Sequence, residues 1–80
     1  APAAPVHVLM IPKAHTENII TAEPELLLYM FGKVKELAEK LGVNEKGFRI
    51  VANTGDDGGQ TVKHLHIHLL GGKALGWPPC

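Results

Sequence analysis

The alternation of apolar and polar positions predicts three strands and one helix, in the order strand, helix, strand, strand. A nearly continuous apolar run, residues 6–11, is closed by Pro12 and is typical of a strand. Two later segments, residues 48–53 and 61–70, are also predicted as strands and flank a glycine-rich loop at residues 54–59. Strands and a single helix in this order predict an α+β fold, in which one long helix covers an antiparallel sheet.

The sequence between the first two runs predicts an amphipathic helix that ends at Leu41. Thr21, Glu23 and Pro24 supply three signals of a helix start: a capping hydroxyl, an acidic first turn and an early proline. Gly42, directly after the helix, is a typical C-terminal signal. Apolar side chains recur at intervals of three and four, and we expect them to form the buried stripe: Leu27, Phe31, Val34, Leu37, Ala38 and Leu41.

Composition narrows the class of protein. The chain has 80 residues, which suits one small domain spanning positions 1–80, and 45% of them are hydrophobic, as in globular proteins. The formal net charge is zero and no basic run is present, so we expect no nucleic-acid partner. The lone cysteine, Cys80, excludes an internal disulfide. No apolar stretch approaches membrane-spanning length and no signal peptide is evident, so we expect a cytoplasmic protein without membrane contact, also nuclear if its source is eukaryotic.

Three of the five histidines alternate with apolar residues in the last predicted strand. Because successive side chains of a strand point to opposite faces, His64, His66 and His68 would share one face. The apolar residues that alternate with them would pack into the core on the other face: Leu65, Ile67 and Leu69. Packing alone hardly explains such a row, and histidine is the side chain best suited to proton transfer and nucleophilic work near neutral pH.

Two alternatives to catalysis stay open at this point. In a strand, His64 and His68 would lie ~13 Å apart at Cα, so one zinc ion could not bind all three histidines. A zinc site would need His15 or His7 from elsewhere, and no cysteine pair or acidic cluster supports it, so we expect no metal. The other alternative is a solvent-facing strand that is rich in histidine by chance, which the strict alternation disfavours.

The loop before the last strand favours phosphate chemistry. Gly58 and Gly59 allow backbone N–H groups to converge on an anion, and Gln60 and Thr61 add side-chain donors for a substrate. A neutral imidazole attacks phosphorus well when a hydrogen bond holds its other nitrogen. His66 is best placed for this role, because it is the middle histidine and can be supported from both sides.

The run HLHIHLL at residues 64–70 resembles the His-x-His-x-His-x-x motif of the histidine triad (HIT) superfamily. Further segments are similar to its Hint branch: IPKAH at residues 11–15, NTGDDGGQTV at residues 53–62, GG at residues 71–72 and WPP at residues 77–79. That branch comprises the purine nucleoside phosphoramidases, also described as protein kinase C-interacting proteins. The resemblance implies a HIT-like α+β fold and an enzyme, a phosphoramidase-type hydrolase.

The resemblance implies a two-step reaction on a purine nucleoside phosphoramidate, such as AMP joined to an amine or to lysine. His66 would attack the α-phosphorus, the amine would leave, and water would release the nucleoside monophosphate from a nucleotidyl-histidine. His68 would orient His66 through its backbone carbonyl and lie near the phosphate. His64 and His15 would form a supporting hydrogen-bond chain.

The resemblance also implies substrate-binding positions and an assembly. Asn53, Gly59 and Thr61 match phosphate-binding positions, and Trp77 matches a position that reaches toward the partner subunit of a homodimer. No metal or other cofactor is needed. Relative to the family, we expect this chain to lack the N-terminal helix and β-hairpin that supply most of the base and ribose pocket. A second function therefore stays open, a catalytically idle module that binds nucleotide or protein partners.

Overall fold

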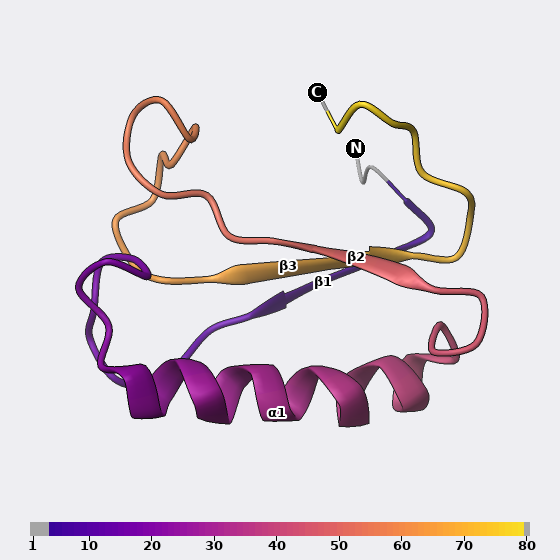
Figure 1. The fold of residues 1–80 in the computed structure, drawn as a ribbon, viewed down its shortest axis with the longest axis horizontal. Coiled ribbons are helices and arrows are strands. Elements are labelled where there is room, and N and C mark those ends of the chain that lie inside the picture. The colour runs from indigo at the N-terminus through magenta and orange to yellow at the C-terminus, as the bar shows by residue number, and fades with distance from the viewer. Residues whose placement is uncertain (1–3, 80) are drawn as a thin grey trace.

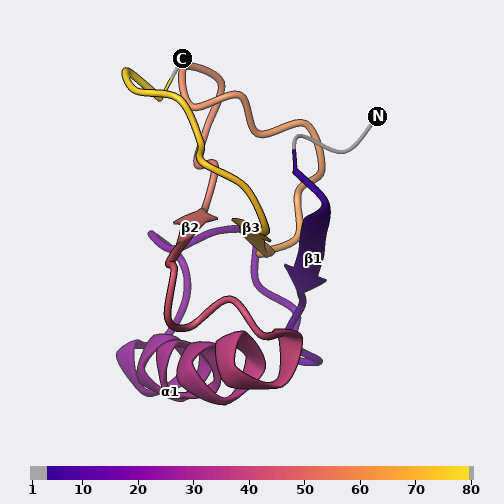
Figure 2. The ribbon, with the colours of Figure 1, turned by 90° about the vertical axis from the view of Figure 1, so that its right-hand side faces the viewer.

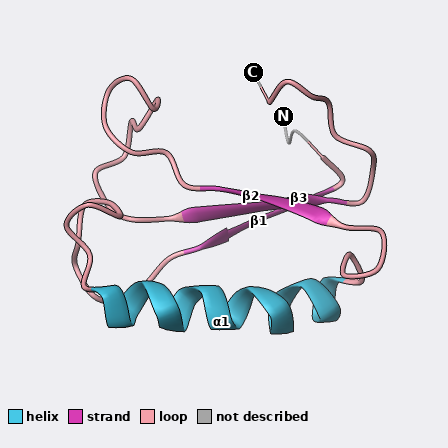
Figure 3. Cartoon of the chain, viewed as in Figure 1, coloured by secondary structure: helices cyan, strands magenta, loops and turns pink. Residues whose placement is uncertain are grey.

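The computed structural model describes residues 4–79 and contains three strands and one helix. Strand β1 spans Val6–Met10, helix α1 Pro24–Leu41, strand β2 Phe48–Val51 and strand β3 Ile67–Gly71. β3 lies in the middle of the sheet and pairs antiparallel with β1 on one side and with β2 on the other. The predicted α+β architecture, an antiparallel sheet covered by one long helix, is confirmed (Figures 1 and 3).

Helix α1 covers only one face of the sheet. Figure 1 shows α1 below the strands, with the loop after β2 and the segment after β3 rising on the opposite side. The view along the sheet in Figure 2 separates the same two layers. One side of each strand therefore faces the core, and the other side faces the two loops.

Local backbone chemistry fixes both ends of α1. Pro24 lies in the first turn, where its missing N–H costs no helical hydrogen bond. At the other end Gly42 adopts a φ of +74°, and the N–H groups of Gly42 and Val43 donate to the carbonyls of Glu39 and Ala38. Among residues 4–79, no helix has the length and apolar character needed to cross a bilayer.

The predicted capping role of Thr21 was wrong. The residue at the cap position is Glu23, which makes no side-chain capping bond. The Thr21 hydroxyl instead accepts from the N–H groups of Glu17 at 3.1 Å and Asn18 at 3.2 Å, and lies 2.7 Å from the Thr16 hydroxyl. Thr21 therefore closes the turn that precedes the helix.

The core forms where α1 packs on β3. Its buried side chains, in two adjoining groups, are Val34, Ala38, Val43 and Leu69, and then Met30, Leu65 and Ile67. The stripe predicted for the helix was wrong at Phe31, which is 51% exposed, whereas Met30 is 3% exposed. The other predicted positions do pack on the core, so Met30 takes the place of Phe31 in an otherwise correct stripe.

Strand β3 is shorter than predicted. β1 ends at Met10 and β2 at Val51, both earlier than predicted, so residues 61–66 have no strand beside them. The N–H of Leu65 donates instead to the carbonyl of Thr16, at 2.8 Å. Regular pairing is therefore limited by the partner strands and not by the composition of the histidine run.

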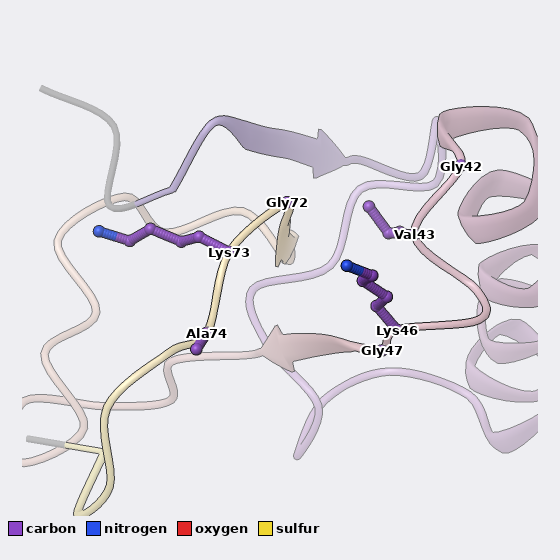
Figure 4. Close-up of a pocket in the computed structure, with 7 residues that line it drawn as sticks. All are labelled: Gly42, Val43, Lys46, Gly47, Gly72, Lys73 and Ala74. Carbon is purple, nitrogen blue, oxygen red and sulfur yellow. The ribbon is translucent and has the colours of Figure 1, made fainter.

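The structure also contains a cavity of about 520 Å³ between the loop after α1 and the segment after β3 (Figure 4). Its lining residues are Gly42, Val43, Lys46, Gly47, Gly72, Lys73 and Ala74. None of these is a histidine or a residue of the glycine-rich loop, so the cavity is separate from the predicted site.

Candidate active site

The alternation of the histidines holds in the structure, although only His68 lies within a regular strand. His64, His66 and His68 are each partly exposed, whereas Leu65 and Ile67 between them are 2% and 1% exposed. Because the buried residues pack against α1, the three imidazoles lie on the face of the sheet opposite the helix.

His66 has one ring nitrogen held by the backbone. Its Nδ1 lies 2.7 Å from the carbonyl oxygen of His64. A carbonyl oxygen only accepts, so Nδ1 carries the proton and the lone pair of the neutral ring is on Nε2, as a nucleophilic Nε2 requires. The prediction that the carbonyl of His68 orients this ring was wrong, because that carbonyl belongs to His64.

The supporting contacts of His64 also differ from those expected. Its Nε2 donates to the carbonyl oxygen of Pro12, at 3.2 Å. The exposed ring of His15 meets the ring of His64 edge-on, with centroids 5.4 Å apart and planes at 82°. The predicted hydrogen-bond chain through His15 was therefore wrong, since His64 is held by the backbone and His15 packs beside it.

His7, which the sequence suggested only as a zinc ligand, joins the triad from β1. Its Nε2 lies 2.9 Å from Nδ1 of His68, and the two ring centroids are 5.2 Å apart. One of the two nitrogens must donate and the other accept, so this contact couples the tautomers of the two rings. The sequence signal that could have placed His7 in the site is its alternation with Val6 and Val8. Both valines are part-buried, so His7 points away from the core.

His68 lies between two other imidazoles. Its ring centroid is 5.2 Å from that of His66 and 5.2 Å from that of His7. Desolvation by burial lowers the pKa of His68 below its ordinary value of 6.5, and the neighbouring His66 and then His7 lower it further. His68 is therefore mainly neutral at pH 7, with one nitrogen that donates and one that accepts.

Two adjacent glycines shape the loop before β3 for different reasons. Gly59 has a φ of +77°, a conformation that favours glycine. Gly58 has no room for a side chain, because a Cβ there would overlap the carbonyl oxygen of Thr54. The Asn53 side chain donates to the carbonyl of Gly58 at 2.7 Å, which closes the loop at its base.

Part of the predicted anion-binding donor set is used inside this loop. The N–H of Gly59 donates to the carbonyl of Asp56 and the N–H of Gln60 to that of Gly55, each at 3.0 Å. The predicted convergence of the glycine N–H groups on an anion is therefore not seen for Gly59 in this conformation. Thr61, directly after them, is exposed and faces solvent.

The Gln60 side chain is not free to bind a substrate. Its Nε2 donates to the carbonyls of Glu17 at 2.7 Å and Val62 at 3.1 Å. Its Oε1 accepts from the N–H of Gly55 at 2.9 Å and from Nδ2 of Asn18 at 3.2 Å. These contacts use all four hydrogen-bonding positions of the amide, so the predicted substrate-binding role of Gln60 was wrong.

Trp77 lies in the segment after β3 and is 78% exposed. Arg49 of β2 holds this segment, because its Nη2 donates to the carbonyl of Gly76 at 2.8 Å and its guanidinium carbon lies 5.8 Å from the centroid of the Trp77 ring. The indole is thus fixed on one side and open on the other. Its role toward a partner subunit stays a prediction.

A surface cavity of about 250 Å³ adjoins the triad and has apolar and imidazole walls. Its lining residues are Leu9, Ile11, Val62, His64 and His66. The three aliphatic side chains are 50%, 57% and 59% exposed, in chain order. An apolar wall next to a few polar groups is the usual composition of a small-molecule site.

The zinc alternative finds no ligand set in the part of the chain that the structure describes. No group of three or more His, Cys, Asp or Glu side chains in residues 4–79 is arranged to hold a metal ion. One ring nitrogen each of His64 and His66 is instead bonded to a backbone carbonyl, and one each of His7 and His68 to the other ring.

Comparison with known proteins identifies the family. Residues 1–75 match the HIT domain family. The chain is 55% identical over 82 aligned positions to an uncharacterised HIT-like protein of Synechococcus elongatus, which covers 99% of this chain and 71% of that protein. The crystal structure of a HIT family hydrolase from Legionella pneumophila matches with a TM-score of 0.92 and 44% identity, over 99% of this chain and 73% of that one. The chain belongs to the HIT domain family.

A histidine triad nucleotide-binding protein from Candida albicans has the same fold. It matches with a TM-score of 0.78 and 31% identity, over 96% of this chain and 62% of that one. The chain therefore has the fold and the histidine triad of hydrolases of the HIT kind.

Proposed function

We propose that this chain cleaves the P–N bond of purine nucleoside phosphoramidates, with Nε2 of His66 as the nucleophile. The observation that carries the proposal is the 2.7 Å contact between His66 Nδ1 and the His64 carbonyl, which leaves the lone pair on Nε2. The same carbonyl would stabilise the positive charge that the ring acquires once Nε2 is bonded to phosphorus.

The reaction has two balanced steps. In the first, Nε2 of His66 forms a bond to the α-phosphorus, the P–N bond breaks, and the amine leaves with a proton. In the second, water attacks the same phosphorus, the P–Nε2 bond breaks, and nucleoside monophosphate is released with the free imidazole restored. The proton that leaves with the amine comes from solvent. His68, 5.2 Å from His66 between ring centroids and neutral at pH 7, is placed to relay it, giving up the proton of one ring nitrogen to the amine while its other nitrogen takes one up.

The surroundings of the triad support a nucleotide substrate. The cavity lined by Leu9, Ile11 and Val62 offers apolar surface to a sugar or a base beside the imidazoles. Exposed Thr61 offers a hydroxyl to the phosphate. The structural relative from Candida albicans is described as a nucleotide-binding protein, and the relative from Legionella pneumophila as a hydrolase.

The Hint branch and its homodimer are part of the same proposal. The WPP sequence at residues 77–79 supports the branch. Three large apolar side chains of α1 are exposed in the single chain and offer surface to a second copy: Leu28, Tyr29 and Phe31.

The second candidate function is a module that binds nucleotide without turnover. The N–H of Gly59 favours the absence of turnover, because it donates within the loop and is not presented to a transferring phosphoryl group. Binding of AMP without cleavage of a phosphoramidate would identify this second function.

The test is the intact mass of the chain after brief mixing with adenosine 5′-phosphoramidate and quenching in neutral guanidinium. The proposal expects an added AMP on the parent chain and none on His66→Ala. An AMP adduct that persists on His66→Ala, or no adduct on a folded parent chain that binds AMP, would overturn it.

A further inference from the structure

Hydrogen bonds tie the turn before α1 to the loop before β3. Figure 1 shows the two segments, indigo to purple and orange, at the same end of the molecule. Asn18 in the turn is a buried polar side chain, 8% exposed. Gln60 in the loop uses its whole amide in hydrogen bonds within the chain.

Asn18 and Gln60 fix the backbone of the turn from two directions. Oδ1 of Asn18 accepts from the N–H of Ile20 at 2.9 Å, while its Nδ2 donates to Oε1 of Gln60 at 3.2 Å. Nε2 of Gln60 in turn donates to the carbonyl of Glu17 at 2.7 Å. Since Thr16 directly precedes Glu17, the position of its carbonyl depends on these contacts.

One peptide group transmits this position to the nucleophile. The N–H of the His64–Leu65 peptide donates to the carbonyl of Thr16 at 2.8 Å, and the C=O of the same peptide accepts from His66 Nδ1 at 2.7 Å. A trans peptide is planar and its N–H and C=O point in opposite directions. Fixing the N–H at Thr16 therefore aims the C=O at His66.

We propose that Asn18 and Gln60 form a latch that positions the His64–Leu65 peptide and thereby holds His66 in the tautomer with its lone pair on Nε2. The two latch residues are positioning residues, because they act through the backbone and not on a substrate. The latch also ties the turn of residues 16–22 to the loop that carries Thr61. The value of this tautomer for catalysis rests on the function proposed above, but the latch itself does not.

The test uses the full 80-residue chain, labelled with ¹⁵N. Asn18→Asp keeps the acceptor for Ile20 and replaces the donor toward Gln60 with a second acceptor. Gln60→Leu removes the whole amide. The matched control is Glu17→Gln, which breaks only an exposed ion pair with Lys63 (4.0 Å) and leaves the Glu17 carbonyl in place. Nitrogen chemical shifts of His66 report its tautomer, and hydrogen exchange of the Leu65 amide reports the bond to Thr16.

We expect the parent and Glu17→Gln to show one His66 tautomer, protonated at Nδ1, and a protected Leu65 amide. In both latch variants we expect a mixture of tautomers and at least about tenfold faster exchange of the Leu65 amide. An unchanged tautomer and unchanged exchange in folded Asn18→Asp would overturn the latch. If Gln60→Leu does not fold, the milder Asn18→Asp decides alone, since its turn retains the bond to Ile20.

Turnover separates the latch from the proposed function. With adenosine 5′-phosphoramidate, the latch predicts that kcat falls about tenfold to hundredfold in Asn18→Asp while KM changes less, because positioning of the nucleophile is disturbed. A folded parent chain without turnover, together with mixed tautomers and faster Leu65 exchange in Asn18→Asp, would contradict the proposed function and support the latch. A variant with a mixed tautomer and full kcat would overturn the catalytic part of the latch.

Discussion

The two faces of the histidine run are built by different kinds of interaction. On one face, Ile67 and Leu69 are each 1% exposed and are held by packing against α1. On the other face, the rings of His64 and His66 are part-exposed and are held by hydrogen bonds to backbone carbonyls. Alternate side chains of one short segment thus serve stability and chemistry separately, so substitutions should affect one property without the other.

The largest effect should come from His66→Ala on the imidazole face. We expect turnover of a nucleoside phosphoramidate to fall by at least about 10³-fold, because the attacking nitrogen is removed. The free energy of unfolding should change by less than about 1 kcal/mol, since the ring is part-exposed and lies on the face of the sheet opposite the core. Steady-state kinetics and guanidinium unfolding measure the two. A large loss of stability in this variant would contradict the separation of stability and chemistry between the two faces.

The converse substitution is Leu69→Ala on the apolar face. We expect the free energy of unfolding to fall by about 2–5 kcal/mol, because a fully buried side chain leaves a cavity. Ile20→Ala is the control, since Ile20 is 78% exposed and its truncation should cost less than about 0.5 kcal/mol. Equal losses from Ile20→Ala and Leu69→Ala in chemical unfolding would contradict this assignment of the core.

A smaller effect should distinguish His7 from His15. His7→Asn removes the imidazole that bonds to His68, so we expect kcat/KM to fall about tenfold to hundredfold. His15→Asn removes only a ring packed edge-on against His64 and should have the smaller effect. Kinetics of the two variants at equal folded fraction provide the measurement. The reverse order of effects would restore His15 as the fourth member of the cluster.

The smallest effect concerns the titration of His68. Because burial and the neighbouring histidines lower its pKa, we expect its ring to titrate below 6.5 in an NMR titration of the folded chain. The unfolded state then binds more protons than the folded state just below pH 6.5, so the contribution of His68 to stability is present above that pH and is lost as the pH falls through the folded pKa. His7→Asn should shift the midpoint toward 6.5, and a midpoint above 6.5 in the parent chain would contradict the assigned cause.

The sequence predicted what depends on local periodicity. The burial of Leu65 and the exposure of His66 follow from alternation alone, and the alternation persists even where regular pairing has ended. Spacing was less decisive in the helix, because Met30 and Phe31 both fit intervals of three and four from other apolar residues. Met30 and Phe31 point in directions that differ by about 100° around the helix, and only contact with the sheet determines which of the two is buried.

Contacts between segments distant in the chain could not be predicted from the sequence. The pairing of His7 with His68 depends on the register that places His7 opposite Leu70. The hydrogen bond from Gln60 to the Glu17 carbonyl depends on where the turn around Glu17 lies in the fold, and no local sequence pattern predicts that position. The sequence thus predicted that His64, His66 and His68 share one face, but not which groups their ring nitrogens contact.

The two glycines at the base of the glycine-rich loop, Gly58 and Gly59, exclude an L-amino acid for different reasons. Gly59, at a φ of +77°, occupies a conformation that a D-amino acid adopts without strain, so a chemically synthesised chain with D-alanine there should fold. L-alanine at Gly58, where φ is not positive, would strike the Thr54 carbonyl. Neighbouring positions with the same side chain are therefore limited by two separate properties, chirality at one and volume at the other.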